Sequence, residues 1–139
     1  MKMAVVVGNP KPKSRTHDAG ILAARGLTGE DPDLVLDLAD MGPKLLEWGN
    51  KDVEAAVAAV CGSGAVVFAS PTYKATYTGL LKLFLDQIPY DGLAGVIGLP
   101  LMLGAAPRLP AAPVYVYDCS TRGHVGDPPG KPSGSGQAG

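Results

Sequence analysis

The chain has 139 residues, of which 46% are hydrophobic and 6% aromatic, and its formal net charge is −1. This length and composition predict one domain with one modest core. A charge so close to zero excludes the broad basic surface that would hold nucleic acid or an anionic membrane. The opening apolar run is too short for a signal peptide, and no run approaches the ~18 apolar residues of a membrane span. We therefore expect a cytoplasmic protein.

The first part of the chain alternates predicted strands with a predicted helix. Met3–Val7 is an unbroken apolar run that stops at Gly8, which is typical of a strand buried on both faces. Isoleucine, leucine and alanine residues then predict a helix over residues 15–26. Residues 33–38 alternate polar and apolar side chains, which predicts a second strand nearer an edge of the sheet.

The alternation continues along the chain. Valines at helical spacing predict a helix that ends at Gly62 or Gly64, and a leucine-rich stripe predicts a later helix that ends at Pro89. The predicted elements are, in order, a helix within residues 50–64, a strand at 65–70, a helix at 76–88, a strand with an internal proline at 95–103 and a short strand at 114–118.

Strands that alternate with helices predict an α/β fold with a parallel sheet and helices on its faces. From Cys119 onward the chain is rich in Gly, Pro and Ser, so we expect a domain over residues 1–118 and a disordered tail over 119–139. Cys61 and Cys119 form no disulfide framework or zinc pattern, and we interpret each as small apolar filler. His17 and His124 have no obvious catalytic partner, and no metal site is predicted.

The loop after the first predicted strand carries candidate phosphate ligands. Ligands of doubly wound sheets bind beyond the carboxyl ends of the strands, where a helix start offers unpaired N–H groups and a positive dipole end. The hydroxyls of Ser14 and Thr16 and the guanidinium of Arg15 suit a phosphate at such a place. The Pro-Lys-Pro that begins at Pro10 stiffens the loop and lowers the entropy lost on binding.

Three alternatives apply to this loop. A Walker nucleotide-binding loop is disfavoured, because Lys13 stands where its second glycine belongs and Ser14 where its lysine belongs. The Rossmann pattern G-x-G-x-x-G is absent from the loop. The structural alternative is that Ser14 or Thr16 simply caps the following helix.

The loops after the predicted strands at 65–70 and 95–103 should lie on the same edge of the sheet. Tyr73 offers an apolar face with a polar tip to a flat ring system, whereas Tyr77 is interpreted as ordinary packing. Lys82 and Asp86 are four residues apart on the predicted helix and are interpreted as a surface pair. The small residues that begin at Gly104 would let the backbone approach a ligand closely.

Here the sequence resembles a known family. The stretches "GNPKPKSRT" (residues 8–16), "ASPTYKATYTGLLKLFLD" (residues 69–86) and "LPLMLGAAPR" (residues 99–108) are similar to the NADPH-dependent FMN reductases of the flavodoxin-like fold. Within that family the likeness is greatest to reductases that supply reduced flavin to two-component monooxygenases such as the alkanesulfonate system. It covers roughly residues 3–108, and Asn9 replaces the usual serine.

The resemblance implies NAD(P)H-dependent reduction of FMN, with hydride passing from the nicotinamide to flavin N5 and no dedicated acid or base. It also implies a homo-oligomer and a flavin-dependent monooxygenase as partner. Ser14, Arg15 and Thr16 would hold the phosphate, the second loop the ribityl chain and ring, and the third loop the ring edge. The implied cofactor-binding residues are Gly8, Pro10, Ser14, Arg15, Thr16, Pro71, Thr72, Tyr73, Lys74, Gly104 and Ala105.

The implied sheet has the strand order 2-1-3-4-5, but the C-terminal quarter departs from the family. Residues 109–113 are too few for the helix expected between strands four and five, and no helix pattern follows strand five. Apolar sheet surface would then be exposed, which favours a partner, a dimer or low stability. Two alternatives to a reductase therefore stay open: a flavin-binding module without turnover, and a chain that binds no ligand.

Overall fold

The structure is a computed structural model that describes residues 1–104. The predicted strand at 114–118, the predicted tail, Ala105, Cys119 and His124 lie outside the described residues. The elements are, in chain order, β1 (Met3–Val7), α1 (Arg15–Thr28), β2 (Leu34–Asp37), α2 (Leu38–Met41), the 3-10 helix η1 (Gly42–Leu46), α3 (Lys51–Cys61), β3 (Ala65–Pro71), α4 (Gly79–Leu85) and β4 (Ile97–Leu103).

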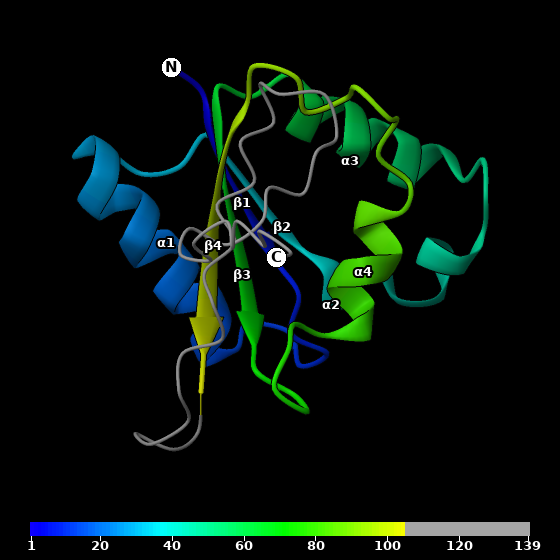
Figure 1. The fold of residues 1–139 in the computed structure, drawn as a ribbon, viewed down its shortest axis with the longest axis horizontal. Coiled ribbons are helices and arrows are strands. Elements are labelled where there is room, and N and C mark those ends of the chain that lie inside the picture. Colours follow the sequence, from blue (N-terminus) through cyan, green and yellow to red (C-terminus); the bar gives the residue numbers. More distant parts are fainter. Residues whose placement is uncertain (105–139) are drawn as a thin grey trace, which may run out of the picture.

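The four described strands form one sheet in the order β2-β1-β3-β4, and every neighbouring pair is parallel. Within the described residues this confirms the predicted parallel sheet and its 2-1-3-4 order. Val5 lies between Val35 of β2 and Val67 of β3, and Val67 in turn pairs with Leu99 of β4. The carboxyl ends of β1, β3 and β4 therefore share one edge, at the lower side of Figure 1, which we call the rim.

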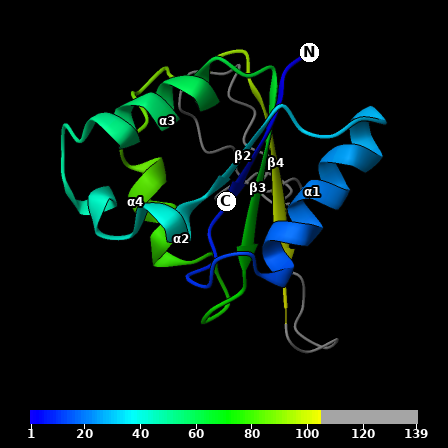
Figure 2. The ribbon, with the colours of Figure 1, turned by 180° about the vertical axis from the view of Figure 1, so that it is seen from behind.

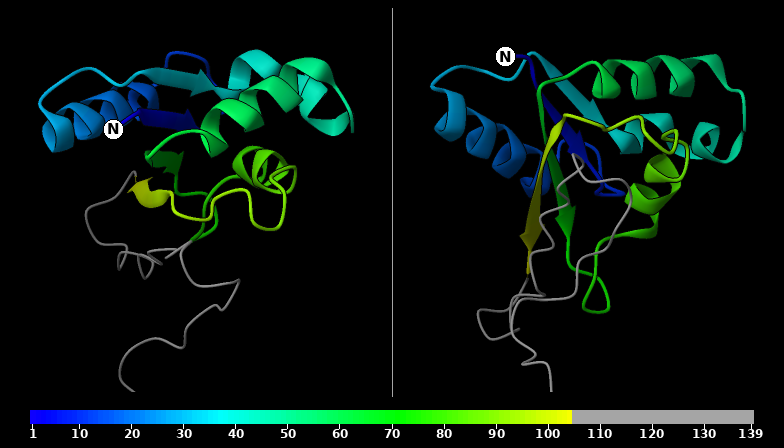
Figure 3. Two further views of the ribbon diagram at one scale, coloured as in Figure 1. Left: turned by 90° about the horizontal axis from the view of Figure 1, so that it is seen from above. Right: turned by 45° about the horizontal axis from the view of Figure 1, so that its top comes forward.

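Helices cover both faces of the sheet. Helix α1 lies on one face, and α2, α3 and α4 lie on the other (Figure 3). The larger core cluster is on the side of the three helices and includes Leu38, Val53, Val60 and Phe84. The α1 side has a smaller cluster built mainly from alternate residues of β1 and β3. Such two-sided cover explains why β1 is buried along its whole length.

The outer strands are less buried than β1 and β3. Every residue of β2 is partly exposed, which agrees with the predicted position near an edge. Ile97 at the start of β4 is 54% exposed, and five of the other β4 residues are partly exposed. Pro100 occupies the middle of β4, where a missing N–H is tolerated because β4 pairs on one side only within residues 1–104.

Helix α1 packs closely against the sheet because of a glycine. A Cβ on Gly20 would lie 2.7 Å from Cγ1 of Val5, so only hydrogen at this position permits the observed approach. The helix ends at Gly29, whose left-handed conformation (φ 80°) supplies the C-cap. Helix α1 therefore ends at Thr28, two residues beyond the predicted end at residue 26.

Helix α4 is shorter than the predicted helix over residues 76–88. Thr76 pairs with Tyr73 in the preceding loop, and Thr78 is the N-cap, so the helix begins at Gly79. After Leu85 the chain continues in turns, and Pro89 follows. The ion pair between Lys82 and Asp86 on the exposed side of α4 is confirmed.

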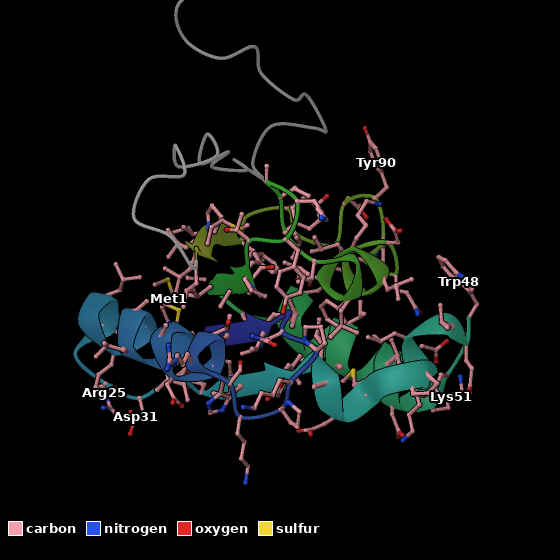
Figure 4. The ribbon with its side chains drawn as sticks, turned by 90° about the horizontal axis from the view of Figure 1, so that it is seen from below. Met1, Arg25, Asp31, Trp48, Lys51 and Tyr90 are labelled. Carbon is pink, nitrogen blue, oxygen red and sulfur yellow. The ribbon has the colours of Figure 1, made fainter. Side chains whose placement is uncertain are left out.

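Features outside the rim are those of an ordinary surface and core. Cys61 is partly buried against the larger core cluster, and burial raises the pKa of its thiol, which agrees with an apolar filler. Figure 4 looks onto the rim and shows Trp48 and Tyr90 pointing outward at the periphery of the molecule, away from the rim. None of the helices within residues 1–104 is long and apolar enough to cross a membrane.

Candidate functional site

Three loops meet at the rim, as the sequence predicted. The loops after β1 and β3 lie side by side in Figures 1 and 2, and Thr78 Oγ1 donates to the Gly8 carbonyl at 2.5 Å. The amide of Gly8 donates to the Ala69 carbonyl at 2.8 Å. The third loop joins them because the Thr72 amide donates to the Leu103 carbonyl at 2.7 Å.

Gly8 has a clear packing role at this junction. A Cβ on Gly8 would lie 2.7 Å from Cβ of Leu81 and 3.1 Å from Thr78 Oγ1. The residue is glycine because the first loop passes directly over the first turn of α4. This contact explains the residue type without a ligand, so a cofactor role for Gly8 stays a prediction.

The start of α1 presents donors that the fold does not use. Ser14 is the N-cap of α1 and is only 5% exposed, and its Oγ accepts a hydrogen bond from the His17 amide at 3.3 Å. The amides of Arg15 and Thr16 donate to no acceptor within residues 1–104. The Arg15 side chain is exposed and forms no ion pair in that part of the chain. A helix start with spare amides, a cap hydroxyl and a cation is suited to an anion.

The capping alternative is therefore correct for Ser14 and does not apply to Thr16. A cap uses an oxygen lone pair of Ser14, and its hydroxyl hydrogen remains for another acceptor. Thr16 lies two residues further along, in the first turn of α1, and is 2% exposed. Its Oγ1 accepts from Nδ2 of Asn9 at 3.0 Å.

Two residues that hold the first loop were missed from the sequence. Asn9 bridges the loop, because its Oδ1 also accepts from the Lys11 amide at 2.9 Å. Asp37, at the end of β2, accepts from the Lys13 amide at 2.8 Å and from the Ala39 amide at 3.4 Å. An acidic residue at the rim end of a neighbouring strand was the signal that could have found Asp37.

The second loop is a hairpin of its own. The amides of Tyr73 and Thr76 each donate to the other residue's carbonyl, at 2.9 and 3.2 Å. Lys74 and Ala75 at the tip both have positive φ, at 52° and 66°, which is the geometry of a type I′ turn. Neither residue is the glycine or asparagine that such a turn favours, and the tip is therefore strained. Tyr73 is 51% exposed beside this turn.

The base of the second loop is buried and polar. Ser70 Oγ donates to the Pro71 carbonyl at 2.9 Å and accepts from the Thr78 amide at 3.0 Å. Pro71 is buried in the last position of β3, opposite Leu103, whereas Thr72 is partly exposed and Lys74 is exposed. The accessible part of this loop is thus its tip.

The structure places the predicted residues on or beside the three loops at the rim, apart from Ala105, which it does not describe. Pro10 and Arg15 are exposed on the first loop and at the start of α1, and Gly104 is exposed after β4. The His17 side chain contacts the neighbouring Asp18, with 3.0 Å between Nδ1 and Oδ1, and only the His17 amide takes part in the rim, through the Ser14 cap. No cluster of His, Cys, Asp and Glu within residues 1–104 could hold a metal ion.

Comparisons with known proteins agree with this architecture. The family model for NADPH-dependent FMN reductase matches residues 1–116. FMN reductase (NADPH) of Escherichia coli (strain K12) is 30% identical over 108 residues, which cover 75% of this chain and 56% of that protein. The apo crystal structure of NADH:FMN oxidoreductase (EMOB) is 36% identical, with a TM-score of 0.68, over 76% of this chain and 59% of that chain.

A further X-ray structure, of an oxidoreductase from Corynebacterium diphtheriae, is 25% identical with a TM-score of 0.60, over 73% of this chain and 63% of that chain. The chain spans less than two thirds of the length of each of these relatives. The parallel order β2-β1-β3-β4 within residues 1–104 is that of the flavodoxin-like fold. With a family model that covers most of its length, the chain belongs to the NADPH-dependent FMN reductase family.

Proposed function

We propose that the chain binds FMN at the rim and reduces it with NAD(P)H. One observation carries the proposal: unused donors at the start of α1 directly follow a loop that is bonded to the second rim loop. This arrangement occurs in a chain of the NADPH-dependent FMN reductase family. The activity is proposed for this chain rather than transferred, because it spans only 56% of the reductase from Escherichia coli.

The residues at the start of α1 fit the phosphate of FMN. The free amides of Arg15 and Thr16 and the hydroxyls of Ser14 and Thr16 are donors, and a phosphate offers only acceptor oxygens at neutral pH. Arg15 adds a positive charge that no acidic side chain within residues 1–104 neutralises. The bonds of Asn9 and Asp37 hold the loop in shape before a ligand arrives, which lowers the entropic cost of binding.

The second and third loops would hold the rest of the flavin. Thr72, Tyr73 and Lys74 project from the strained turn, and Tyr73 is exposed enough to lay its ring against another ring. Gly104 presents backbone without a side chain on the third loop. We assign Pro71 and Ala105 to the same contacts, with Pro71 acting through its backbone because its side chain is buried.

The protein's part in the reaction is then to bind, orient and exclude water. Bound FMN supplies the hydride-accepting chemistry, so the chain needs no acid or base of its own. The rim loops would fix the phosphate end of FMN, and direct hydride transfer would then require a nicotinamide to stack on the flavin ring. A homo-oligomer, a cytoplasmic location and delivery of reduced flavin to a monooxygenase belong to the same proposal.

Flavin binding and turnover are tested in sequence on the purified chain. We expect the fluorescence of FMN to be quenched when the protein is added. We also expect the absorbance of NAD(P)H to fall with time when the protein and free FMN are both present. Binding without NAD(P)H oxidation would favour the second candidate, a flavin-binding module, which the short span relative to the family supports. Absence of flavin binding would exclude both candidates.

Replacing Arg15 tests the phosphate assignment. We expect Arg15→Ala to weaken FMN binding by about ten- to a hundredfold, because a charge-assisted bond to phosphate contributes roughly 1.5–3 kcal/mol. Riboflavin, which has no phosphate, should lose less than about threefold. Arg25→Ala is the matched control, since Arg25 lies at the opposite end of α1 and pairs with Asp31 (Figure 4). Equal losses for FMN and riboflavin would remove Arg15 from the phosphate site.

A further inference from the structure

Asn9 occupies the position at which the resembling family has a serine. Its side chain makes two hydrogen bonds, and the first of them determines which end of the amide takes part in the second. The Lys11 amide can only donate, so the Asn9 atom that faces it, at 2.9 Å, is the carbonyl oxygen Oδ1. The amide nitrogen Nδ2 is therefore the atom that faces Thr16 Oγ1, at 3.0 Å. The orientation of the Asn9 amide follows from chemistry, because exchanging its two ends would place donor against donor at Lys11.

This orientation constrains the hydroxyl of Thr16. Because Nδ2 donates to Oγ1, the hydroxyl hydrogen of Thr16 cannot be directed at Asn9. That hydrogen meets no acceptor within residues 1–104, although Thr16 is almost completely buried. A buried donor without an acceptor is costly, so this hydrogen is suited to an acceptor that a ligand brings.

We propose that Asn9 is a positioning residue that commits the Thr16 hydroxyl as a donor to the phosphate of FMN. The inference rests on the proposed function, since it takes the ligand at the start of α1 to be that phosphate. The Asn9 Oδ1 accepts from the Lys11 amide, and Nδ2 uses one of its two hydrogens on Thr16. In this proposal Asn9 acts on FMN binding through Thr16, and the competing arrangement, a direct bond from the second Nδ2 hydrogen to the phosphate, is distinguished by its additive losses.

A double-mutant cycle measures this path. Fluorescence titrations with FMN and with riboflavin would compare the wild-type chain, Asn9→Ala, Thr16→Val and the double variant. We expect each single change to weaken FMN binding roughly tenfold and riboflavin binding less than about threefold. The double variant should bind FMN no more weakly than Thr16→Val alone, because Asn9 has nothing to direct once the hydroxyl is gone.

Reversing the polarity of residue 9 gives an independent readout. In Asn9→Asp the carboxylate still accepts from the Lys11 amide, but it presents an acceptor to Thr16 and draws the hydroxyl hydrogen away from the phosphate. We expect Asn9→Asp to weaken FMN binding more than Asn9→Ala does. High salt screens the repulsion between the added carboxylate and the phosphate, so the part of the loss that comes from the turned hydroxyl should persist at high salt. Thr16→Ser keeps the hydroxyl and should bind FMN within about threefold of wild type.

The outcomes separate the two proposals. A wild-type chain that binds no flavin overturns both proposals. A chain that binds FMN no better than riboflavin has no phosphate site, which overturns the roles of Arg15, Thr16 and Asn9 but leaves flavin binding standing. A wild-type preference for FMN combined with additive losses in the cycle, or with equal losses for riboflavin, overturns the assignment of Asn9 alone. Melting temperatures accompany every titration, and Asn9→Ser, the residue of the resembling family, replaces Asn9→Ala if that variant does not fold.

Discussion

The two main rim loops have the same length and the same ending but are built differently. Residues 8–14 and 72–78 each form a seven-residue connection from a parallel strand to a helix. Each ends in a hydroxyl N-cap, Ser14 or Thr78, that accepts from the amide three residues later. In the first loop Asn9 bonds to Thr16 of α1 and the Lys13 amide bonds to Asp37 of β2, whereas the strained tip of the second loop is closed by bonds between its own residues Tyr73 and Thr76.

This difference indicates that the two loops bind different parts of a ligand. A loop whose bonds lead to other elements is fixed before a ligand arrives, which suits recognition of a small anion at one place. A hairpin whose tip is closed by its own backbone bonds, with an exposed tyrosine beside it, suits contact with a broad flat ring. The two hydroxyl caps show the same contrast, because the Thr78 hydroxyl also donates to the Gly8 carbonyl while the Ser14 hydroxyl donates to nothing within residues 1–104.

The junction of the two loops should be the most sensitive place. Gly8→Ala would put a Cβ 2.7 Å from Cβ of Leu81, and we expect it to destabilise the chain by about 2–3 kcal/mol, as overpacking of a rigid contact does. Gly26→Ala is the control: a Cβ there has nothing within 4 Å, and helix propensity should stabilise that variant by up to about 1 kcal/mol. Urea unfolding without flavin measures both, and equal stabilities would contradict the proposed contact.

Substitutions at the two N-caps, Ser14 and Thr78, test whether the two loops bind different parts of the ligand. Thr78→Val removes the donor to the buried Gly8 carbonyl and the acceptor of the Leu81 amide, so we expect a loss of about 2 kcal/mol in stability. Ser14→Ala removes only the cap bond to the His17 amide and should cost about 1 kcal/mol. Preference for FMN over riboflavin should fall in Ser14→Ala and persist in Thr78→Val.

A reversed pattern in those titrations would contradict the comparison. If Thr78→Val abolished the preference for FMN while Ser14→Ala kept it, the phosphate would belong beside the second loop. Thr78→Ser retains the hydroxyl and serves as the matched control for the fold. Its unfolding free energy should lie closer to that of wild type than that of Thr78→Val does.

The fold and the position of the site were predictable because both depend on local patterns. Apolar runs that end at Gly8 and at Ser70-Pro71 predict buried parallel strands, and parallel strands bring their following loops to one edge. The pairing of Asn9 with Thr16 and of Asp37 with the Lys13 amide was not predictable, because each depends on how a proline-stiffened loop folds back. Nor was the short α4, since residues 76–78 suit a helix by pattern but are used in the turn and the cap.

The smallest expected effect concerns the strained tip of the second loop. Ala75 has a φ of 66°, where a side chain costs roughly 1 kcal/mol and glycine costs little, so Ala75→Gly should stabilise the chain by about 0.5 kcal/mol after the added entropy of the unfolded state. Ala55→Gly, an exposed position in α3, should instead destabilise it by about 1 kcal/mol. Thermal unfolding of both variants gives the comparison. Equal destabilisation by the two substitutions would mean that the turn stores no strain, and the contrast between a self-supporting and an externally held loop would then lose its energetic basis.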